Sequence, residues 1–246
     1  MTMLAPSLRH RATGLSELMD DPACDQRALE RTYARFGIVN RLVSGWSRVY
    51  RHRILPLAAA AQRDGAPPLS ILDVGFGGGD VPVAIAGWAA RDGVDVRLTA
   101  IDPDERAHAF ASRRDAPPSV RFRRASSGDL VTAGERFDVV LSNHVLHHLD
   151  AAALDGLLAD SERLARRVVV HNDIERGALA YQGYQVAITP LSPGSFLRTD
   201  GLRSIRRSYT LVELADVLPT GWRVERQSPF RLLALFEPPT TTGAGS

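Results

Sequence analysis

The 246-residue sequence contains no lysine, so its 30 basic residues are all arginines. Without a lysine amine, a Schiff-base mechanism and a P-loop that grips phosphate through lysine are both excluded. Cys24 is the only cysteine, which excludes a disulfide framework and a thiolate zinc cluster. The chemistry of the protein must therefore rest on other residue types.

Long apolar runs are also missing. No segment approaches about 18 consecutive apolar residues, so no transmembrane helix and no membrane partner are predicted. Residues 1–11 lack the apolar centre of a signal peptide, and a cytoplasmic location is expected. The arginines are spread along the chain against 28 acidic residues, whereas nucleic-acid binding requires clustered positive charge. A nucleic-acid partner is therefore not expected.

Short apolar strands alternate with helical segments from residue 69 onward. The predicted strands are 70–74, 95–101, 119–123, 137–142 and 167–171, and the predicted helices are 81–90, 104–114 and 150–166. This alternation is typical of right-handed crossovers and of an α/β fold with a parallel, doubly wound sheet. Asp150 is expected to cap the last of these helices.

The last part of the chain has a different pattern. Thr210 to Glu213 forms a capping-box sequence, which predicts a helix that continues through Leu218. Two strands are predicted at 222–227 and 230–236, with only two residues between them. That spacing is typical of a hairpin, so the last strand should run antiparallel to the others.

Apolar residues between positions 15 and 61 recur at helical spacing, and a glycine- and proline-rich break follows at 64–68. The expected organisation is an N-terminal helical cap or lid (1–65), a core (66–237) with a substrate-side insertion at about 174–208, and a flexible tail (238–246). Several glycines and prolines in the insertion predict an irregular conformation for it.

The segment from Ile71 to Asp80 carries the strongest ligand signal: a buried strand enters a turn with four glycines, and a helix begins at once. Glycines permit positive φ, and a helix N-terminus offers free N–H groups to a ligand. A dinucleotide fingerprint requires glycine at the position of Asp80. The Asp80 carboxylate would also repel the pyrophosphate of a dinucleotide. Asp80 suits a ligand that carries an ammonium and a sulfonium. Asp102, which ends the second strand, can accept hydrogen bonds from both ribose hydroxyls.

Four motifs occur in order along the chain: Leu-Asp-Val-Gly-Phe-Gly-Gly-Gly-Asp (72–80), Ile-Asp-Pro (101–103), Phe-Asp-Val-Val-Leu-Ser-Asn (137–143) and Leu-His-His-Leu (146–149). With them, residues 69–236 resemble class I S-adenosylmethionine-dependent methyltransferases, most closely the small-molecule branch of ubiquinone and menaquinone methyltransferases. Segments 172–176, 206–210 and 229–231 resemble a bacterial subgroup of polyketide-associated O-methyltransferases. The resemblance implies a Rossmann-like sheet of seven strands in the order 3-2-1-4-5-7-6.

The resemblance also implies S-adenosyl-L-methionine as methyl donor and S-adenosyl-L-homocysteine as product. The cofactor contacts that it implies are Asp73, Gly75, Gly77, Gly78, Asp80, Asp102, Pro103, Ser126, Ser127, Ser142 and Asn143. Relatives often carry an acid after the third strand that reaches the adenine amino group. Ser126 stands at that position here, so either its hydroxyl or Asp129 would make this contact.

Methyl transfer to a phenol benefits from a positioned base, and histidine is the natural candidate near neutral pH. The candidates at the carboxyl edge of the sheet are His144, His148 and Asp173. His144 follows the fourth strand and should face the methyl-transfer cavity. His147 and His148 are adjacent in a turn and point about 100° apart, so only one of them is expected to face the cavity. Asp173 could orient a histidine or bind a hydroxyl.

Histidines and acids near this edge also have atoms that can bind metal, namely those of His147, His148, His171 and Asp173. No ordered ligand motif such as His-x-x-x-His is present, and the acidic set of the magnesium-dependent catechol enzymes is not visible. No metal site is therefore expected.

The acceptor is expected to bind against the insertion. The N-terminal helices are expected to cap the cofactor, because a sulfonium site works best without water. The residues assigned to acceptor binding are His171, Arg176, Tyr181 and Tyr33, with Tyr184, Phe196 and Leu197 as further apolar walls. The candidate lid aromatics are Tyr33, Phe36, Trp46 and Tyr50.

The resemblance favours methyl transfer to an oxygen of a phenolic, quinol or polyketide-like small molecule in bacterial secondary metabolism. C-methylation of an electron-rich ring stays open. A nucleic-acid or protein methyltransferase is disfavoured, because Ser142-Asn143-His144-Val145 is not the loop that cradles a flipped base. A non-catalytic cofactor-binding protein is the remaining alternative. Both a monomer and a homodimer are compatible with the sequence.

Overall fold

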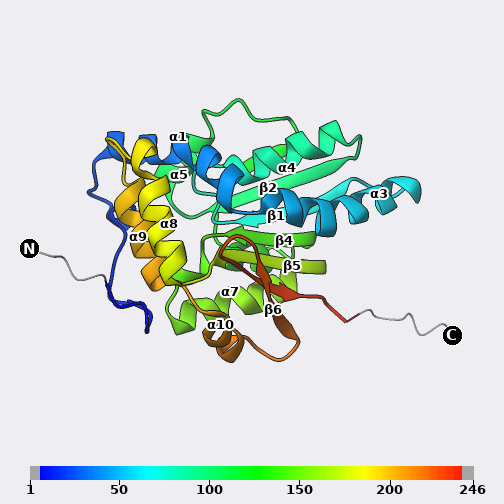
Figure 1. The fold of residues 1–246 in the computed structure, drawn as a ribbon. Coiled ribbons are helices and arrows are strands. Elements are labelled where there is room, and N and C mark those ends of the chain that lie inside the picture. The colour runs from blue at the N-terminus through cyan, green and yellow to red at the C-terminus, as the bar shows by residue number, and fades with distance from the viewer. Residues whose placement is uncertain (1–5, 240–246) are drawn as a thin grey trace, which may run out of the picture.

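The computed structural model describes residues 6–239, which form one sheet with helices on both faces (Figure 1). The strands are β1 (Leu69–Val74), β2 (Val96–Asp102), β3 (Val120–Arg124), β4 (Phe137–Asn143), β5 (Ala165–Ile174), β6 (Trp222–Gln227) and β7 (Arg231–Phe236). Their order in the sheet is β3-β2-β1-β4-β5-β7-β6. The predicted order is therefore confirmed, together with the Rossmann-like fold class.

Strands β1 to β5 are parallel, and β7 pairs antiparallel with both β5 and β6. Val74 at the end of β1 pairs with Ile101 on one side and with Ser142 on the other. The carboxyl ends of β1, β2 and β4 consequently meet at one edge of the sheet, where ligands bind in open α/β folds.

One face of the sheet is covered by α2 (Trp46–Val49), the π-helical segment η2 (Tyr50–Ile54), α3 (Leu55–Arg63) and α4 (Asp80–Arg91). Trp46 and Tyr50, which the sequence suggested as lid residues, are 3% and 1% exposed and belong to this core layer. The segment 46–63 is therefore part of the sheet cover. Of residues 6–65, only some between positions 17 and 43 reach the cavity described below.

The opposite face carries α6 (Ser127–Thr132), α7 (Ala151–Leu164) and α10 (Leu211–Val217). The Asp150 side chain accepts a hydrogen bond from the Ala153 N–H, as the cap prediction requires. The Thr210–Glu213 capping box is present in full. These local signals decide where α7 and α10 begin, because each satisfies N–H groups that the first helical turn leaves unpaired.

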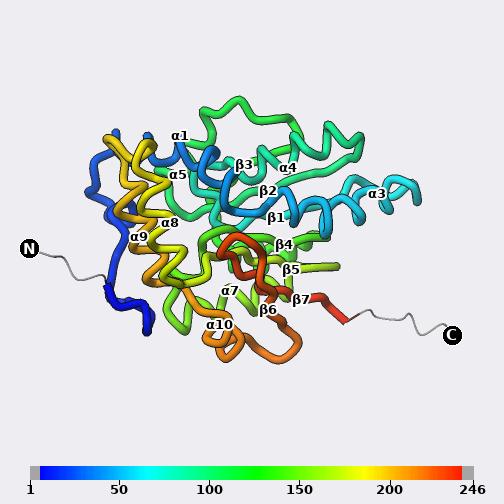
Figure 2. The backbone as a smooth tube through the Cα atoms, in the orientation of Figure 1, coloured from blue at the N-terminus to red at the C-terminus, as the bar shows by residue number. Residues whose placement is uncertain are grey.

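The carboxyl edge of the sheet is covered by α1 (Gln26–Val43), α8 (Ala178–Ala187) and α9 (Leu197–Arg207), together with the short helices η1 (Leu18–Asp20), η3 (Leu146–His148) and η4 (Thr189–Leu191). Helix α5 (Glu105–Ala111) packs against Ala100 of β2, on the face that carries α4. Figure 2 shows the N-terminal segment running beside α9. There the Leu18 and Met19 N–H groups donate to the Asp200 carboxylate over 2.7 and 3.0 Å.

The insertion at 174–208 is largely helical, which differs from the irregular conformation that its glycines and prolines predicted. Gly201 in α9 lies against the ring of Tyr184 in α8, and a Cβ at position 201 would come within 2.3 Å of that ring. This glycine permits close helix packing and does not end a helix. Its role depends on a residue of another helix, so the local sequence did not reveal it.

Most boundaries lie within two residues of the predicted ones, and two elements end three residues away. The helix expected over 104–114 ends at Ala111, and the strand expected over 167–171 extends from Ala165 to Ile174. The strand continues because Asn172, Asp173 and Ile174 pair with β7, a partner that the strand's own sequence does not reveal. Within residues 6–239, no helix has the length and apolar character that crossing a membrane requires. Of the predicted tail, residues 240–246 lie outside the described residues.

Candidate active site

The glycine loop joins β1 to α4 and forms one wall of a cavity. Gly75, Gly77 and Gly79 have φ values of 75°, 51° and 72°, in the left-handed region that favours glycine. A Cβ at Gly78 would lie 2.9 Å from the Tyr33 carbonyl oxygen, so only a glycine lets α1 approach this closely. The loop therefore presents bare backbone to the cavity beneath α1.

Asp102 at the end of β2 is held beside this loop. The Gly77 N–H donates to one carboxylate oxygen and the Asp104 N–H to the other, both over 2.9 Å. Burial raises the pKa of Asp102, and these two N–H groups partly oppose that rise by stabilising the charged form. The carboxylate is thus fixed at the cavity wall with further acceptor capacity for a ligand.

Asp73 lies one residue before the end of β1 and is 1% exposed. Neither of its carboxylate oxygens has a hydrogen-bond partner among the described residues. Burial raises its pKa well above the usual range, and the nearby carboxylates of Asp80 and Asp102 raise it further. Because an unpartnered buried carboxylate is costly, this group calls for a cationic or hydrogen-bond-donating ligand.

Asp80, the first residue of α4, has one partner. The Asn40 amide of α1 donates to its carboxylate over 2.9 Å, and the Asn143 amide donates to the Asn40 side-chain oxygen over 3.3 Å. Burial raises the pKa of Asp80, and the Asn40 hydrogen bond partly opposes this. The chain of amides connects the glycine loop, α1 and the end of β4.

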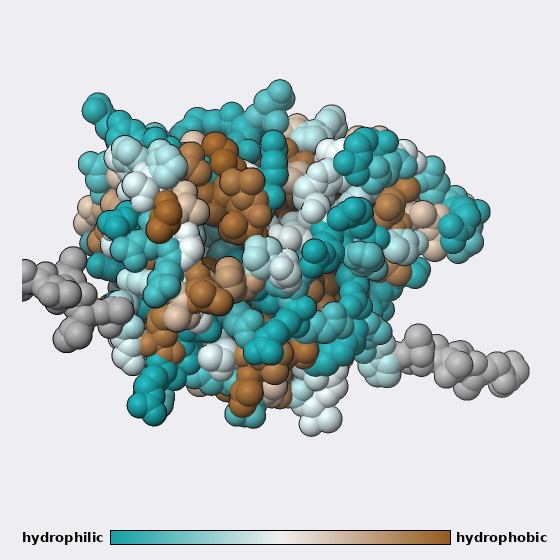
Figure 3. Space-filling view, in the orientation of Figure 1, coloured by the Kyte–Doolittle hydropathy of each residue, from teal (hydrophilic) through white to brown (hydrophobic). Residues whose placement is uncertain are grey.

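These groups surround a cavity of about 540 Å³, a size typical of small-molecule sites. Of the predicted site residues, its lining includes Tyr33, Asp73, Gly75, Gly77, Asp80, Asp102, Pro103, Asn143, His144 and His148. Helices α1, α8 and α9 supply the outer walls. Figure 3 shows this face hollowed where α1, α8 and the β6–β7 turn meet in Figure 1, with apolar side chains beside the hollow.

Other predicted cofactor contacts do not line the cavity. Gly78 packs behind it against α1, and Ser142 is fully buried with its hydroxyl 2.8 Å from His171 Nδ1. Ser126 and Asp129 form the capping box of α6, and the Ser127 hydroxyl donates to Asp160 over 2.7 Å. The adenine contact predicted for Ser126 or Asp129 stays a prediction.

Of the predicted acceptor-binding residues, only some lie at the cavity. His171 is fully buried, lies between the Ser142 and Ser161 hydroxyls and stacks on Trp222, and burial lowers its pKa to about 3. The Arg176 guanidinium donates to the carbonyls of Leu8, Arg9 and Ser208 and pairs with Glu213. His171, Arg176 and Tyr181 lie outside the cavity lining, and Tyr33 lies within it. The first two are structural because the polar partners of each are all protein groups.

His144 follows β4 with a φ of 61°, an unusual value for a residue other than glycine. Arg231 in β7 donates to its Nε2 over 3.0 Å, and an arginine can only donate. Nε2 is therefore an acceptor, and the neutral ring carries its hydrogen on Nδ1. Burial lowers the pKa of His144 well below its usual value, and the Arg231 charge lowers it further. The ring faces the cavity, but its free nitrogen is a donor and not a base.

Arg231 was not among the predicted site residues. It is 2% exposed, and it also donates to the Asn172 side chain over 2.8 Å and to the Asn143 side chain over 3.0 Å. It thereby joins the ends of β4, β5 and β7 at the cavity. The sequence offered the Pro229-Phe230-Arg231 segment only as part of a subgroup resemblance, with no sign that this arginine is buried.

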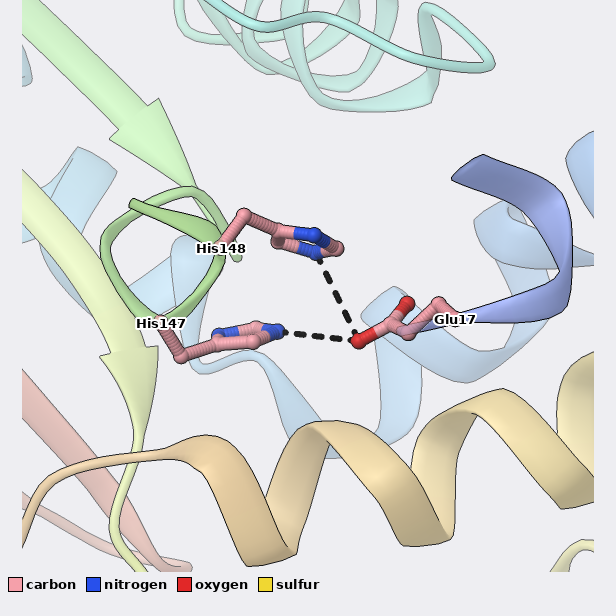
Figure 4. Close-up of side chains that lie close together, drawn as sticks. All are labelled: Glu17, His147 and His148. Atoms are coloured by element: carbon pink, nitrogen blue, oxygen red, sulfur yellow. Dashed lines mark ion pairs between the residues drawn. The ribbon is translucent and has the colours of Figure 1, made fainter. Parts of the chain in front are cut away.

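A second group of charged side chains lies across the cavity (Figure 4). His147 Nδ1 lies 2.7 Å from an Asp173 carboxylate oxygen, and its Nε2 points to Glu17 Oε1 at 3.3 Å. His148 lies 3.6 Å from the same Glu17 oxygen through Nε2 and 3.3 Å from Asp20 through Nδ1. The prediction that only one of the adjacent histidines faces the cavity agrees with this arrangement, since His148 lines it and His147 does not.

Interactions between opposite charges set the protonation states of His147 and Asp173. Burial alone would lower the pKa of His147, but Asp173 and Glu17 raise it to about 9. Burial would raise the pKa of Asp173, but His147 holds it below its usual range. Asp173 does not line the cavity, so its part is to orient His147, one of the two roles considered for it from the sequence.

Sequence reasoning missed several polar cavity residues besides Arg231, among them Glu17, Asn40, Asp200 and Ser204. Asn40 and Glu17 lie in the N-terminal region, where the sequence predicted only aromatic lid residues. Asp200 and Ser204 share one face of α9, as their spacing of four residues allows. That spacing was the one signal that could have been used.

Comparisons with known proteins agree with this geometry. A family model described as a methyltransferase domain matches residues 71–167, from β1 into β5. The ubiquinone biosynthesis O-methyltransferase of Rhizobium leguminosarum bv. trifolii (strain WSM2304) is 34% identical over 83 residues, which are 33% of this chain and 31% of that protein. The match thus spans about a third of the length of this curated relative.

Solved structures have the same fold. The plantazolicin methyltransferase BpumL, in complex with a pentazolic desmethylPZN analog and SAH, has a TM-score of 0.56 and 13% identity, covering 90% of this chain and 96% of that one. Human N-acetylserotonin methyltransferase, in complex with SAM, has a TM-score of 0.59 and 11% identity, covering 87% and 56%. The predicted resemblance to class I S-adenosylmethionine-dependent methyltransferases is confirmed.

Proposed function

We propose that the protein is an S-adenosyl-L-methionine-dependent methyltransferase that methylates an oxygen of a phenolic, quinol or polyketide-like small molecule in bacterial secondary metabolism. We further propose that it acts in the cytoplasm, as a monomer or homodimer. The relative from ubiquinone biosynthesis is an O-methyltransferase, which supports oxygen as the methyl acceptor. The plantazolicin methyltransferase is bound to a desmethylPZN analog and SAH, which supports S-adenosylmethionine as the donor.

The observation that carries this proposal is the unpartnered Asp73 carboxylate beneath the glycine loop. Its two buried oxygens, with the Asp80 carboxylate close by, form a negative pocket that suits the ammonium group of the amino acid part of the cofactor. Asp102, fixed by the Gly77 and Asp104 N–H groups, suits the two ribose hydroxyls. One wall of the cavity therefore offers a partner for the amino acid part and a partner for the ribose of S-adenosylmethionine.

When bound, S-adenosylmethionine supplies an activated methyl group, whose bond to sulfur breaks as the bond to the acceptor oxygen forms. The chain orients the donor through Asp73 and Asp102 and excludes water with α1, α8 and α9. Proton removal from the acceptor hydroxyl must occur elsewhere than at His144, because Arg231 occupies its acceptor nitrogen. We assign this step to the side of the cavity that carries Glu17 and His148.

Calorimetric titration of the protein with S-adenosylmethionine and S-adenosylhomocysteine tests the cofactor site. Gly77→Arg and Asp102→Ala are expected to abolish binding, since the first fills the cavity wall and the second removes the ribose acceptor. Asp115→Asn, an exposed carboxylate distant from the cavity lining, is the matched control and should bind as the wild type does. Unchanged affinity in both site variants would overturn the assignment of the site.

Mass spectrometry after incubation with S-adenosylmethionine and a panel of phenols and quinols tests the acceptor class. The expected result is a mass gain of one CH₂ group on at least one panel member. Nuclear magnetic resonance of the product then distinguishes an O-methyl group from the alternative ring C-methyl group. Cofactor binding without product from any acceptor would favour the non-catalytic alternative.

A further inference from the structure

Three side chains from distant parts of the sequence converge beside the cavity: Glu17 before η1, and His147 and His148 in η3 (Figure 4). Their ligand-type atoms, one from each residue, all lie within 4.8 Å of one another. Glu17 and His147 are buried, and the His148 side chain is 27% exposed. Glu17 and His148 line the cavity, so the cluster borders the site assigned above to the acceptor.

The two separations that involve Glu17 have the size expected between ligands of one metal ion. Glu17 Oε1 lies 3.3 Å from His147 Nε2 and 3.6 Å from His148 Nε2. Tetrahedral zinc with bonds of about 2.0–2.2 Å separates its ligand atoms by about 3.3–3.6 Å. The two histidines and the glutamate would need little movement to share a zinc ion.

An independent observation comes from His147 Nε2. This atom is fully buried, points to Glu17 in Figure 4, and has no hydrogen-bond partner, because the approach at 3.3 Å lacks hydrogen-bond geometry. Asp173 holds the opposite ring nitrogen at 2.7 Å. A carboxylate that binds one nitrogen and directs the other outward is the usual support of a metal-binding histidine.

The other ligand groups have outer partners as well. The Ser204 hydroxyl donates to Glu17 Oε1 over 2.6 Å, and a carboxylate oxygen can accept this bond and still bind a metal. Asp20 lies 3.3 Å from His148 Nδ1, which leaves Nε2 directed toward Glu17. Arg207 approaches Asp20 at 3.6 Å and donates to the His148 carbonyl over 3.1 Å, so it supports the same turn from outside.

We propose that Glu17, His147 and His148 bind a zinc ion whose fourth ligand position faces the cavity. Two histidines and one glutamate form a donor set that zinc accepts, and three protein ligands with one open position are typical of zinc sites that bind water or substrate. The occupant of that position is a small acceptor with an ionisable hydroxyl, and the metal charge lets this hydroxyl release its proton to bulk water. This role of the ion rests on the proposed function, whereas the metal site itself does not.

The test is metal binding by the whole chain, measured after removal of metal with a chelator. Titration with zinc chloride, with metal content read by mass spectrometry, should give one zinc ion per chain. Glu17→Gln and His148→Asn should each weaken zinc binding by more than the roughly 10-fold to 100-fold that loss of an outer partner such as Asp173 costs. His52→Asn, an exposed histidine outside the cluster, is the control and should keep wild-type affinity.

Cobalt(II) provides a second readout for variants that fold poorly. The wild-type protein should give the visible absorption bands of four-coordinate cobalt, and Glu17→Gln should lose them at equal secondary-structure content. Binding of zinc that is equally strong in Glu17→Gln, His148→Asn and wild type would overturn the proposal, as would no zinc binding by the wild type. The cluster would then be a histidine held between two carboxylates without metal.

Two separate titrations distinguish a failure of the zinc proposal from a failure of the proposed methyltransferase function. Titration with S-adenosylhomocysteine reports on the glycine-loop wall, which contains none of the three proposed ligands. Zinc binding without cofactor binding would leave the metal site standing and remove the methyltransferase proposal. Cofactor binding and methyl transfer without zinc binding would do the reverse.

Discussion

Arg231 Nη1 in β7 lies 3.0 Å from His144 Nε2 at the end of β4, and the arginine is the donor. The contact makes His144 a neutral side chain whose remaining nitrogen bears hydrogen, although the sequence suggested it as a base. It also ties the hairpin at the edge of the sheet to the cavity wall. Both consequences can be measured.

Replacement of His144 by asparagine should lower turnover by about 10-fold to 100-fold through lost positioning, with little change in cofactor affinity. Asparagine tolerates the positive φ of this position, so the backbone should keep its path. Because burial and Arg231 hold the pKa of His144 well below its usual value, its charge does not change near neutral pH. The pH profile of kcat should therefore keep its shape, and loss of a titration step in the variant would contradict this prediction.

Replacement of Arg231 by lysine should destabilise the fold. An ammonium group cannot reach His144, Asn143 and Asn172 together, and each buried acceptor left without a donor costs about 1–3 kcal/mol. The free energy of unfolding in urea should fall by at least about 2 kcal/mol. Arg97→Lys, on an exposed arginine of β2, is the control and should be within about 0.5 kcal/mol of wild type. An equal loss of unfolding free energy in Arg231→Lys and Arg97→Lys would show that the buried contacts of Arg231 do not stabilise the fold.

Cofactor affinity should rise with pH through the titration of Asp73. Burial and the carboxylates of Asp80 and Asp102 raise the pKa of Asp73 in the free protein, and a bound ammonium group favours its ionised form. Binding therefore releases protons at pH values below that raised pKa, and affinity weakens as the pH falls. Calorimetry in two buffers of different ionisation enthalpy measures this release. The Asp73→Asn variant should bind more weakly and lose the proton release, and release of equal size in that variant would assign it to another group.

The packing of Gly201 against Tyr184 predicts a stability effect in the insertion at 174–208. Gly201→Ala should lower the free energy of unfolding by about 1–3 kcal/mol, because the new Cβ would meet the tyrosine ring. Gly156→Ala in α7 is the matched helical control, where a Cβ meets no neighbour and a gain of up to about 1 kcal/mol is expected. The double variant with Tyr184→Ala should be less sensitive to Gly201→Ala, since the colliding ring is then absent. If Gly201→Ala destabilises the wild type and the Tyr184→Ala variant equally, the collision with the tyrosine ring is not the cause.

Much of the fold followed from patterns that act over short distances. The strand periodicity, the cap at Asp150 and the Thr210–Glu213 box depend on neighbours within one turn or one strand, and all are present. The sheet order followed from the family resemblance. The length of β5 and the helices of the insertion could not be predicted in this way, because both depend on partners from other parts of the chain.

The residues of the site also fall into those that the sequence predicts and those that only the tertiary structure reveals. Asp73, Asp80, Asp102 and the glycines could be found from the sequence, because the strand-turn-helix motif that presents them is continuous and its backbone conformation requires those residue types. The position of Glu17 against His147 and His148, and of Arg231 against His144, was decided by the tertiary structure alone. The physical reason is that burial, and with it the cost of an unpaired charge, exists only once distant segments have packed together. An acid or arginine takes its role from the partner it meets there.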